Sequence, residues 1–319
     1  MRLLLRFICI INLLPLVANA QVDSAYIRPF VHSNEVEAIP GIFFTSFEFR
    51  KGKDRLQDYN LKANGSAYLG GYVQYKWLSI KYAFNIPGTQ LDRNTNVHLT
   101  SFKLRFGNRK MIFHPFYDAY NGLLMPDNRR HEFTEFRNIL VNHIGLDYFY
   151  YFNSKRVSFD AAYGFSEKQL RSAGAPFIMV TPVWQRINWR VPSHDLVTDS
   201  ATYKLLASNP QWVSAVVRAG YGYNFVIEGG KWLIAPAVAV GGGVLHEIKG
   251  NRGLKPIFDM QGWISAGFNG DPWYWYVHAA WSRRHSNLFV KDVVKQDSDF
   301  YVTVGYRFGS LPNKIFGIL

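Results

Sequence analysis

The chain of 319 residues contains a single cysteine, Cys9, and it lies in an N-terminal apolar segment that carries the marks of a cleaved leader. Without it, the mature chain has no thiol, no disulfide and no cysteine-ligated metal, so a secreted domain that depends on disulfides is excluded. Cys9 comes early in the apolar run rather than after a short spacer of small residues, so the sequence does not predict a lipid-anchored protein.

Long apolar runs are also missing, because no later stretch approaches about 18 consecutive apolar residues. A membrane-spanning helix needs about 20, so a helical membrane protein is excluded. Charged residues are scarce, at 18% against about 25% in globular proteins. Hydrophobic residues make up 48% of the chain and aromatic residues 17%. An apolar, aromatic-rich chain without such a helix favours a membrane β-barrel.

Residues 1–20 have the three parts of a signal peptide. Arg2 and Arg6 supply the positive start, an apolar core follows, and Ala18-Asn19-Ala20 forms a small-residue cleavage site. The apolar core is too short to span a membrane as a helix. We therefore expect residues 21–319 to be exported as a single domain, to the outer membrane of a Gram-negative bacterium.

Much of the remaining sequence alternates between apolar and polar residues. In one long stretch the apolar set is Phe300, Val302, Val304, Tyr306 and Phe308, and the interleaved set is Tyr301, Thr303, Gly305, Arg307 and Gly309. A period of two places the two sets on opposite faces of a strand. Similar stretches occupy residues 68–77, 78–85, 158–165, 213–225, 259–268 and 273–282.

The spacing of these stretches predicts an all-β chain: one antiparallel transmembrane barrel of about 12–14 strands. The strands are about 9–14 residues long, whereas those of a soluble β-sandwich are usually about 5–6. A soluble secreted β-sandwich that serves as a binding module is therefore the minor alternative. Residues 21–41 are weakly patterned and predict either a periplasmic lead-in or a first strand.

Connection lengths predict which end of each strand faces the periplasm, since barrels have short periplasmic turns and long outer loops. Short, turn-rich connections occur at Lys51–Asp54, Gly107–Arg109, Asn153–Lys155, Glu228–Gly230 and Asn269–Asp271. Long connections occur near residues 87–96, 122–137, 188–210, 246–256 and 286–298. Short and long connections alternate except between residues 153 and 210, so a strand there is either merged or missed.

The polar phase of the strands carries charge, and the whole chain has a formal net charge of +13. A charge on the lipid face would cost about 2–4 kcal/mol at the midplane, so these residues are expected to face the lumen. The predicted pore-lining residues are Lys81, Lys103, Arg105, Asp118, Asp147, Asp160, Arg218, Asp259, His278, Arg284 and Arg307. Inward tyrosine and tryptophan side chains predict a narrow or plugged lumen.

Arg218 and Arg307 are the most direct test of which face of each strand points inward. The residues before and after each arginine are apolar and are expected to face lipid, which places the arginine in the lumen. Each guanidinium needs water or a carboxylate in a dry lumen. Asp160 and Asp259 are the expected inward partners, without a pairing that the sequence can assign. The charges either line an open pore or pair across the lumen and close it.

Two segments are not explained by alternation, namely residues 74–79 and 165–174. They resemble landmarks of an uncharacterised family of outer-membrane proteins from the Bacteroidota, of the domain of unknown function 4421 type. The matching residues are Tyr75, Lys76 and Trp77 in the first segment and Gln169, Ser172, Ala173 and Gly174 in the second. A Gly-Tyr-rich strand at residues 219–223 extends the resemblance, which spans about residues 40 to 310. It implies an outer-membrane barrel and brings no catalytic residues.

The expected function is that of a non-enzymatic barrel, either a narrow channel or a structural and surface-interaction protein of unknown ligand. No catalytic, metal or cofactor site is predicted. The expected partners are outer-membrane lipid, lipopolysaccharide and the outer-membrane assembly machinery, with no nucleic acid. The positive charge suits anionic head groups or an anion-biased lumen.

The alternative function is a barrel hydrolase that acts on lipid or peptide at the outer rim. It would need a histidine beside a serine or carboxylate. His285-Ser286-Asn287 has suitable residue types, but sequence neighbours on a strand point to opposite faces. Asp127, His131, Glu132 and Glu135 cluster in a predicted loop and are interpreted as solvated residues.

Overall fold

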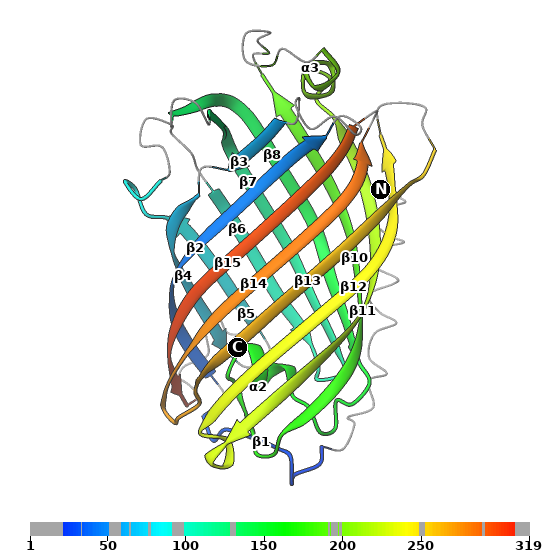
Figure 1. The fold of residues 1–319 in the computed structure, drawn as a ribbon. Helices are drawn as coiled ribbons and strands as arrows, with labels where there is room; N and C mark the ends of the chain where they lie inside the picture. Colours follow the sequence, from blue (N-terminus) through cyan, green and yellow to red (C-terminus); the bar gives the residue numbers. More distant parts are fainter. Residues whose placement is uncertain are drawn as a thin grey trace, which may run out of the picture.

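The computed structural model describes residues 22–32, 34–50, 59–63, 65–75, 78–90, 99–127, 132–190, 192, 197, 200–248, 253–288 and 291–309. Twelve strands form one closed antiparallel barrel (Figure 1). They are β2 (Asn34–Arg50), β4 (Ser66–Tyr75), β5 (Leu78–Asn85), β6 (Leu99–Gly107), β7 (Met111–Asp127), β8 (Glu132–Tyr151), β10 (Ala173–Trp189), β11 (Gln211–Ile227), β12 (Trp232–Glu247), β13 (Lys255–Phe268), β14 (Trp273–Leu288) and β15 (Lys291–Phe308). The barrel closes where β15 pairs with β2, so the predicted architecture is confirmed at twelve strands.

The two ends of the barrel differ. The start of β2 and the end of β15 lie at one end, called here the inner end, together with β1 (Ile27–Pro29), β9 (Glu167–Gln169) and α2 (Phe159–Tyr163). The opposite, outer end carries α3 (Ser200–Ala207) and β3 (Tyr59–Ala63), which pairs with β2 and β7. A 3-10 turn, η2 (Glu228–Gly230), joins β11 to β12 at the inner end. No helix of the described chain is long and apolar enough to span a membrane.

The outer wall of the barrel is apolar, in the phase that the alternation predicts. Exposed outward side chains include Val36, Phe44, Val73, Phe84, Ile144, Val217, Tyr221, Val238, Ile264, Phe300 and Val304. Aromatic rings gather where strands meet the inner end: Trp232 lies 5.7 Å from Trp275, and Trp273 lies 4.8 Å from Tyr306, between ring centroids. An apolar wall with an interfacial aromatic belt is the surface of a barrel that faces lipid.

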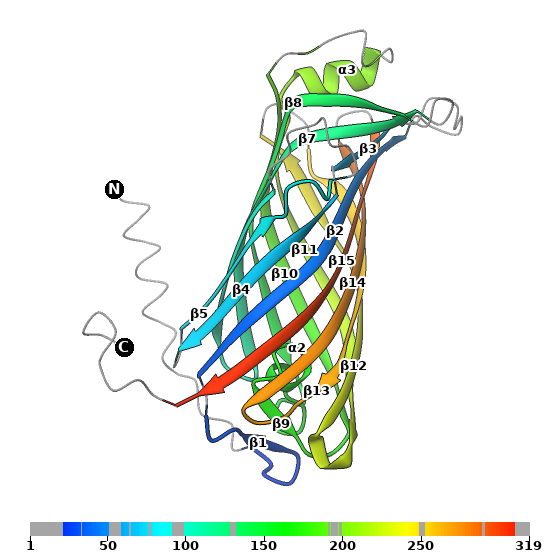
Figure 2. The same cartoon turned by 90° about the vertical axis from the view of Figure 1, so that its left-hand side faces the viewer.

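The predicted long loop at residues 122–137 is wrong, because β7 continues to Asp127 and β8 begins at Glu132. A register shift between Asn121 and Leu123 marks a bulge, and Gly122 adopts a φ of 83°, which glycine tolerates best. Beyond it, β7 and β8 bend across the outer end of the barrel (Figure 2). The predicted loop at 286–298 is likewise a continuation of β14 and β15.

The strand predicted over residues 158–165 is also wrong, because this segment contains the helix α2 inside the lumen. Ser158 caps the helix by accepting a hydrogen bond from the amide of Ala161 at 2.9 Å. Without this strand, the connections alternate between the inner and the outer end along the whole barrel. The irregularity noted between residues 153 and 210 therefore disappears. Of the weakly patterned residues 21–41, those from Asn34 onward belong to the first barrel strand. The signal peptide and the Lys51–Asp54 turn lie outside the described residues.

Candidate functional site

The outer end of the lumen is filled by apolar side chains from the outer ends of the strands. Phe49, Trp189, Trp212 and Leu245 belong to one buried cluster with residues of α3. Leu206 of α3 is completely buried in this cluster. We call this cluster the outer layer. It closes the barrel by hydrophobic packing rather than by charge.

Below the outer layer lies a charged chamber. It consists of two overlapping cavities of about 340 and 440 Å³ that share much of their lining. Six cationic and four acidic side chains of the described residues line the first cavity. Ten of the predicted inward residues line one or both cavities: Lys81, Lys103, Arg105, Asp118, Asp147, Asp160, Arg218, Asp259, His278 and Arg284.

One ion-pair group in the chamber joins three strands. Arg218 Nε donates to Asp259 Oδ1 at 2.5 Å, and Arg284 Nε donates to Asp259 Oδ2 at 2.7 Å. Gly241 lies between Arg218 and Asp259 in the strand register, and a Cβ there would overlap the backbone of β11. The absence of a side chain leaves the room across which the guanidinium reaches its carboxylate. The structure thus assigns Asp259, one of the two expected partners, to Arg218.

Several residues of the chamber were not in the predicted set. Lys295 donates to Asp297 at 2.8 Å, Thr45 donates to Asp297 at 2.6 Å, and Tyr68 donates to Asp299 at 2.9 Å. The three β15 residues share the inward phase of Tyr301, which could have identified them. Lys295 and Asp297 were missed because residues 286–298 were interpreted as a loop, and Asp299 precedes Phe300, where the predicted strand begins.

The inner end of the chamber is closed by residues 152–172, which we call the insert. Val157, Ala161 and Phe165 of the insert are buried against the barrel wall. The ring of Phe165 stacks on Tyr276 with centroids 4.5 Å apart. Burial raises the pKa of the Tyr163 hydroxyl in α2, so that this group stays neutral. The insert therefore fills the lumen as an internal plug.

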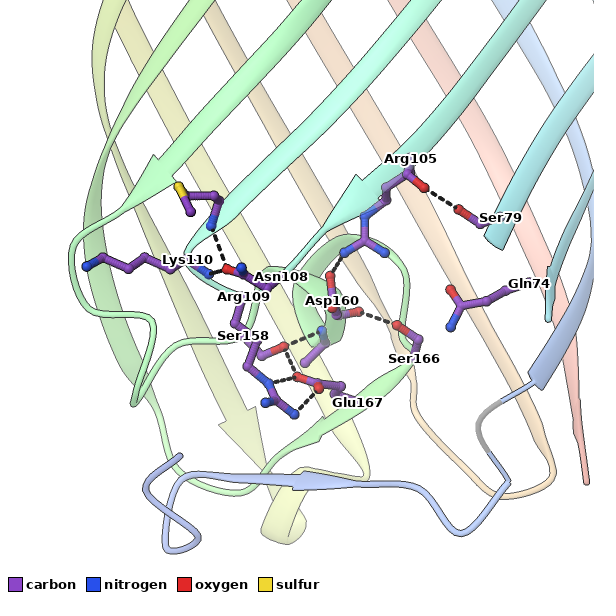
Figure 3. Close-up of polar contacts among 12 residues, drawn as sticks. Gln74, Ser79, Arg105, Asn108, Arg109, Lys110, Ser158, Asp160, Ser166 and Glu167 are labelled. Atoms are coloured by element: carbon purple, nitrogen blue, oxygen red, sulfur yellow. Dashed lines mark hydrogen bonds and ion pairs between the residues drawn. The ribbon is translucent and has the colours of Figure 1, made fainter. Parts of the chain in front are cut away.

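Charged groups tie the insert to the barrel (Figure 3). Arg109, in the turn between β6 and β7, holds Glu167 with two nitrogens, one of them Nε at 3.0 Å from Oε2. Ser158 also donates to Glu167 Oε2, at 2.6 Å. Arg105 of β6 forms an ion pair with Asp160 of α2. Asp160 thus faces the chamber from a helix, whereas the sequence placed it on a strand.

The family-motif residues lie mainly at the insert. Gln169 is buried, accepts from the amide of Ser158 at 3.0 Å and donates to the carbonyl of Arg156 at 2.6 Å. Ser172 accepts from the amide of Val226 at 2.9 Å, and the carbonyl of Gly174 accepts from Asn153 at 2.9 Å. Ala173 begins β10, which follows the insert, and Tyr75 ends β4 in a buried position. Lys76 and Trp77 lie outside the described residues.

Arg307 faces inward as the alternation predicts but lies below the chamber. Its guanidinium donates to the carbonyls of Phe165 and Gly270 and to Asn269 Oδ1, and it stacks 3.7 Å from the Phe30 ring centroid. Neither expected partner, Asp160 or Asp259, contacts Arg307; carbonyl and amide oxygens accept its hydrogen bonds, and Glu35 is the carboxylate that most stabilises its charge. Arg307 therefore links three segments at the inner end: the insert, the turn that contains Asn269 and Gly270, and the N-terminal segment that contains Phe30.

Two described histidines lie near groups of the kind a hydrolase would need, in separate parts of the barrel. His285 is half-exposed, 4.0 Å from Asp292, and His131 lies outside the described residues. A hydrogen bond of 2.8 Å joins Ser265 to His278, but Ser265 is fully buried in the wall rather than at the outer rim. Within the described residues, no group of three histidine, cysteine or acidic side chains is placed to hold a metal ion.

The family model described as Domain of unknown function (DUF4421) matches residues 21–308, so the chain belongs to this family. No curated protein matches the chain in sequence. Among solved structures, the chain is similar to the β domain of the Bordetella autotransporter Brka, with a TM-score of 0.45, 11% identity, and coverage of 86% of this chain and 99% of that chain.

The outer membrane protease OmpT from Escherichia coli is similar at a TM-score of 0.35 and 9% identity, over 90% of this chain and 99% of that one. An outer membrane channel from Pseudomonas putida F1 is similar at a TM-score of 0.36 and 10% identity, over 90% of this chain and 100% of that one.

Proposed function

We propose that this family member is a non-enzymatic outer-membrane barrel that acts as a narrow, gated channel for small solutes and is closed at both ends in the observed conformation. The observation that carries the proposal is the charged chamber, which lies between the outer layer and the insert. Rings of charged side chains select solutes in channels, and hydrophobic constrictions gate them by excluding water.

The apolar wall and its aromatic belt support a location in the outer membrane of a Gram-negative bacterium, of the Bacteroidota type that the family resemblance implies. The start of the first barrel strand, the end of the last one and most of the short turns lie at the inner end of the barrel. We therefore assign the inner end to the periplasm. Outer-membrane lipid and lipopolysaccharide would then contact the wall, and α3 would lie on the cell surface.

A purely structural barrel is the competing function. It would gain stability from a lumen filled with apolar side chains, as the outer layer is filled. The chamber instead keeps charged groups around open volume, at the energetic cost of holding them away from bulk water. Retention of such a chamber favours a channel.

Planar-bilayer recording tests the proposal. We expect wild-type protein to be silent, because the outer layer and the insert block the same path in series. The double change Asp160→Asn and Glu167→Gln should loosen the insert, and Trp189→Ala should open the outer layer. Each of these alone should stay silent or flicker, and their combination should conduct in discrete steps.

Glu228→Gln is the matched control, since Glu228 also forms an ion pair near the inner end but lies on the exposed η2 turn. This variant should stay as silent as wild type. Folding of every variant is checked by the altered migration of unheated barrel on a denaturing gel. A combined variant that is folded, inserted and silent would contradict the channel and favour a structural barrel.

A further inference from the structure

Two lysines lie side by side on adjacent strands of the chamber wall. Lys81 of β5 and Lys103 of β6 are direct cross-strand partners in the antiparallel register, and both line the two cavities. Like charges placed directly opposite each other on a sheet destabilise it. A pair of this kind, inside a barrel, needs a compensating anion.

Carboxylates of the described protein offset that charge without contacting either ammonium group: Asp118, Asp147, Asp297 and Asp299 attract Lys103, and Asp299 and Glu37 attract Lys81. Neither ammonium group has a hydrogen bond or an ion pair to any described residue, and Lys81 instead lies 4.3 Å from the centroid of the Tyr301 ring. Lys103 remains exposed to the cavity although it points into the lumen. The other lumen cations behave differently, since Arg105, Arg218, Arg284 and Lys295 each hold a carboxylate.

Two of these carboxylates, Asp118 and Asp299, accept hydrogen bonds from neighbouring hydroxyl groups. Asp118 accepts from Ser101 at 2.6 Å, and Asp299 accepts from Tyr68 at 2.9 Å. Both line the small cavity of about 70 Å³ beside the lysines, yet neither forms an ion pair with them. They balance part of the charge at longer range, and the hydrogen-bond donors of both ammonium groups stay available for direct contact with a ligand.

We propose that Lys81 and Lys103 form a binding site for a small phosphate-type oxyanion, either inorganic phosphate or a compact phosphate ester. Directly opposite residues on a sheet have Cβ atoms about 5 Å apart, so both flexible ammonium groups can reach one tetrahedral anion. Lysine binds phosphate as a point charge, and the cavity of about 340 Å³ limits the ligand to a small molecule. The inference rests on the proposed function, because it names the class of solute that the channel holds.

The test measures binding by its effect on unfolding, so it needs no passage through a closed barrel. Purified protein is refolded into detergent in the presence of inorganic phosphate, glycerol phosphate or sodium chloride, at one constant ionic strength, and the denaturation midpoint is recorded against ligand concentration. A ligand that binds only the folded state raises the midpoint in proportion to its occupancy. We expect both phosphate compounds, and not chloride, to raise it.

Lys81→Gln and Lys103→Gln should each weaken the apparent phosphate affinity at least about tenfold. Lys295→Gln is the matched control, since it removes one positive charge from the same chamber but from a lysine that already holds Asp297. It should change the affinity less than about threefold. No phosphate-specific shift in wild type, or an equal loss in Lys295→Gln, would overturn the site. Because conductance is not the readout, failure here is distinguishable from failure of the channel.

Discussion

The outer layer and the insert close the same lumen by different physical means. The outer layer consists of apolar side chains that belong mostly to the barrel strands themselves, such as Trp189 and Phe49. The insert is a separate connection that also buries apolar groups but is held to the barrel by Glu167, Asp160 and Gln169, the last of which accepts from Asn224. Opening the first closure requires side chains of several strands and of α3 to repack, whereas the second closure belongs to one connecting segment.

This difference assigns a role to each end. Apolar packing is non-directional and contributes to the stability of the whole barrel. Polar ties on a connecting segment set a local opening free energy, which is lower than that of global unfolding. We therefore expect the insert to move first when the channel opens. The outer layer should remain the barrier that limits the passage of solute.

The largest predicted effect on stability comes from a change in the chamber, which lies between the outer layer and the insert. Arg218→Glu places a second carboxylate against Asp259 in a buried setting. Breaking a buried ion pair costs about 3–5 kcal/mol, so the free energy of unfolding should fall by about that amount. Conductance should stay near zero, because neither closure is altered. A stable variant with increased cation conductance would instead show that the lumen is open in the resting state.

Trp189→Ala should have a global effect of similar size. The side chain is almost fully buried and packs on Phe136 and Tyr203, with ring centroids 5.8 Å away in both cases. Truncation of a buried tryptophan costs about 3–5 kcal/mol, measured as a lower denaturation midpoint of the refolded barrel. Trp189→Phe should recover most of the loss. If Trp189→Ala left global stability unchanged and only loosened α3, the outer layer would be a lid rather than a core.

Sequence patterns predicted the barrel because lipid imposes one constraint on every strand, an apolar outward face. That constraint correctly placed Arg218 inside and Val217 outside. It could not place the insert, since residues 158–165 lie inside the lumen, where no face contacts lipid. Phe159 and Tyr163, four residues apart, meet on one face of α2 with centroids 5.0 Å apart.

The pattern also fails where strands leave the membrane. Lys295 and Asp297 lie on β15, but residues 286–298 lack the apolar outward set, so they were interpreted as a loop. The pairing of Arg218 with Asp259 depends on the register of three strands with Gly241 between them. Register is a property of the assembled sheet, and a single sequence does not reveal it.

Glu167→Gln tests the insert alone. It removes the charge that Arg109 holds while keeping the shape of the side chain, and hydrogen bonds to charged groups contribute about 1.5–3 kcal/mol. The free energy of local opening should fall by this amount, which is measured as faster hydrogen exchange of the amides in residues 157–169. The denaturation midpoint of the whole barrel should change less. Glu228→Gln, at a pair with 60% and 62% exposed side chains, should change neither quantity measurably. Uniform acceleration across all strands would show that the insert and barrel open together.

The smallest effect concerns the cap of α2. Ser158→Ala removes the side-chain oxygen that accepts from the amide of Ala161 and the hydroxyl that donates to Glu167. Loss of a helix cap costs about 0.5–2 kcal/mol, and it should appear as faster exchange confined to α2. Ser166→Ala is the matched control, because Ser166 makes only a 3.5 Å contact with the carbonyl of Asp160. If the two variants exchange alike, the helix is held by its packed rings and not by its cap, and the insert would then resemble the outer layer more than its polar ties suggest.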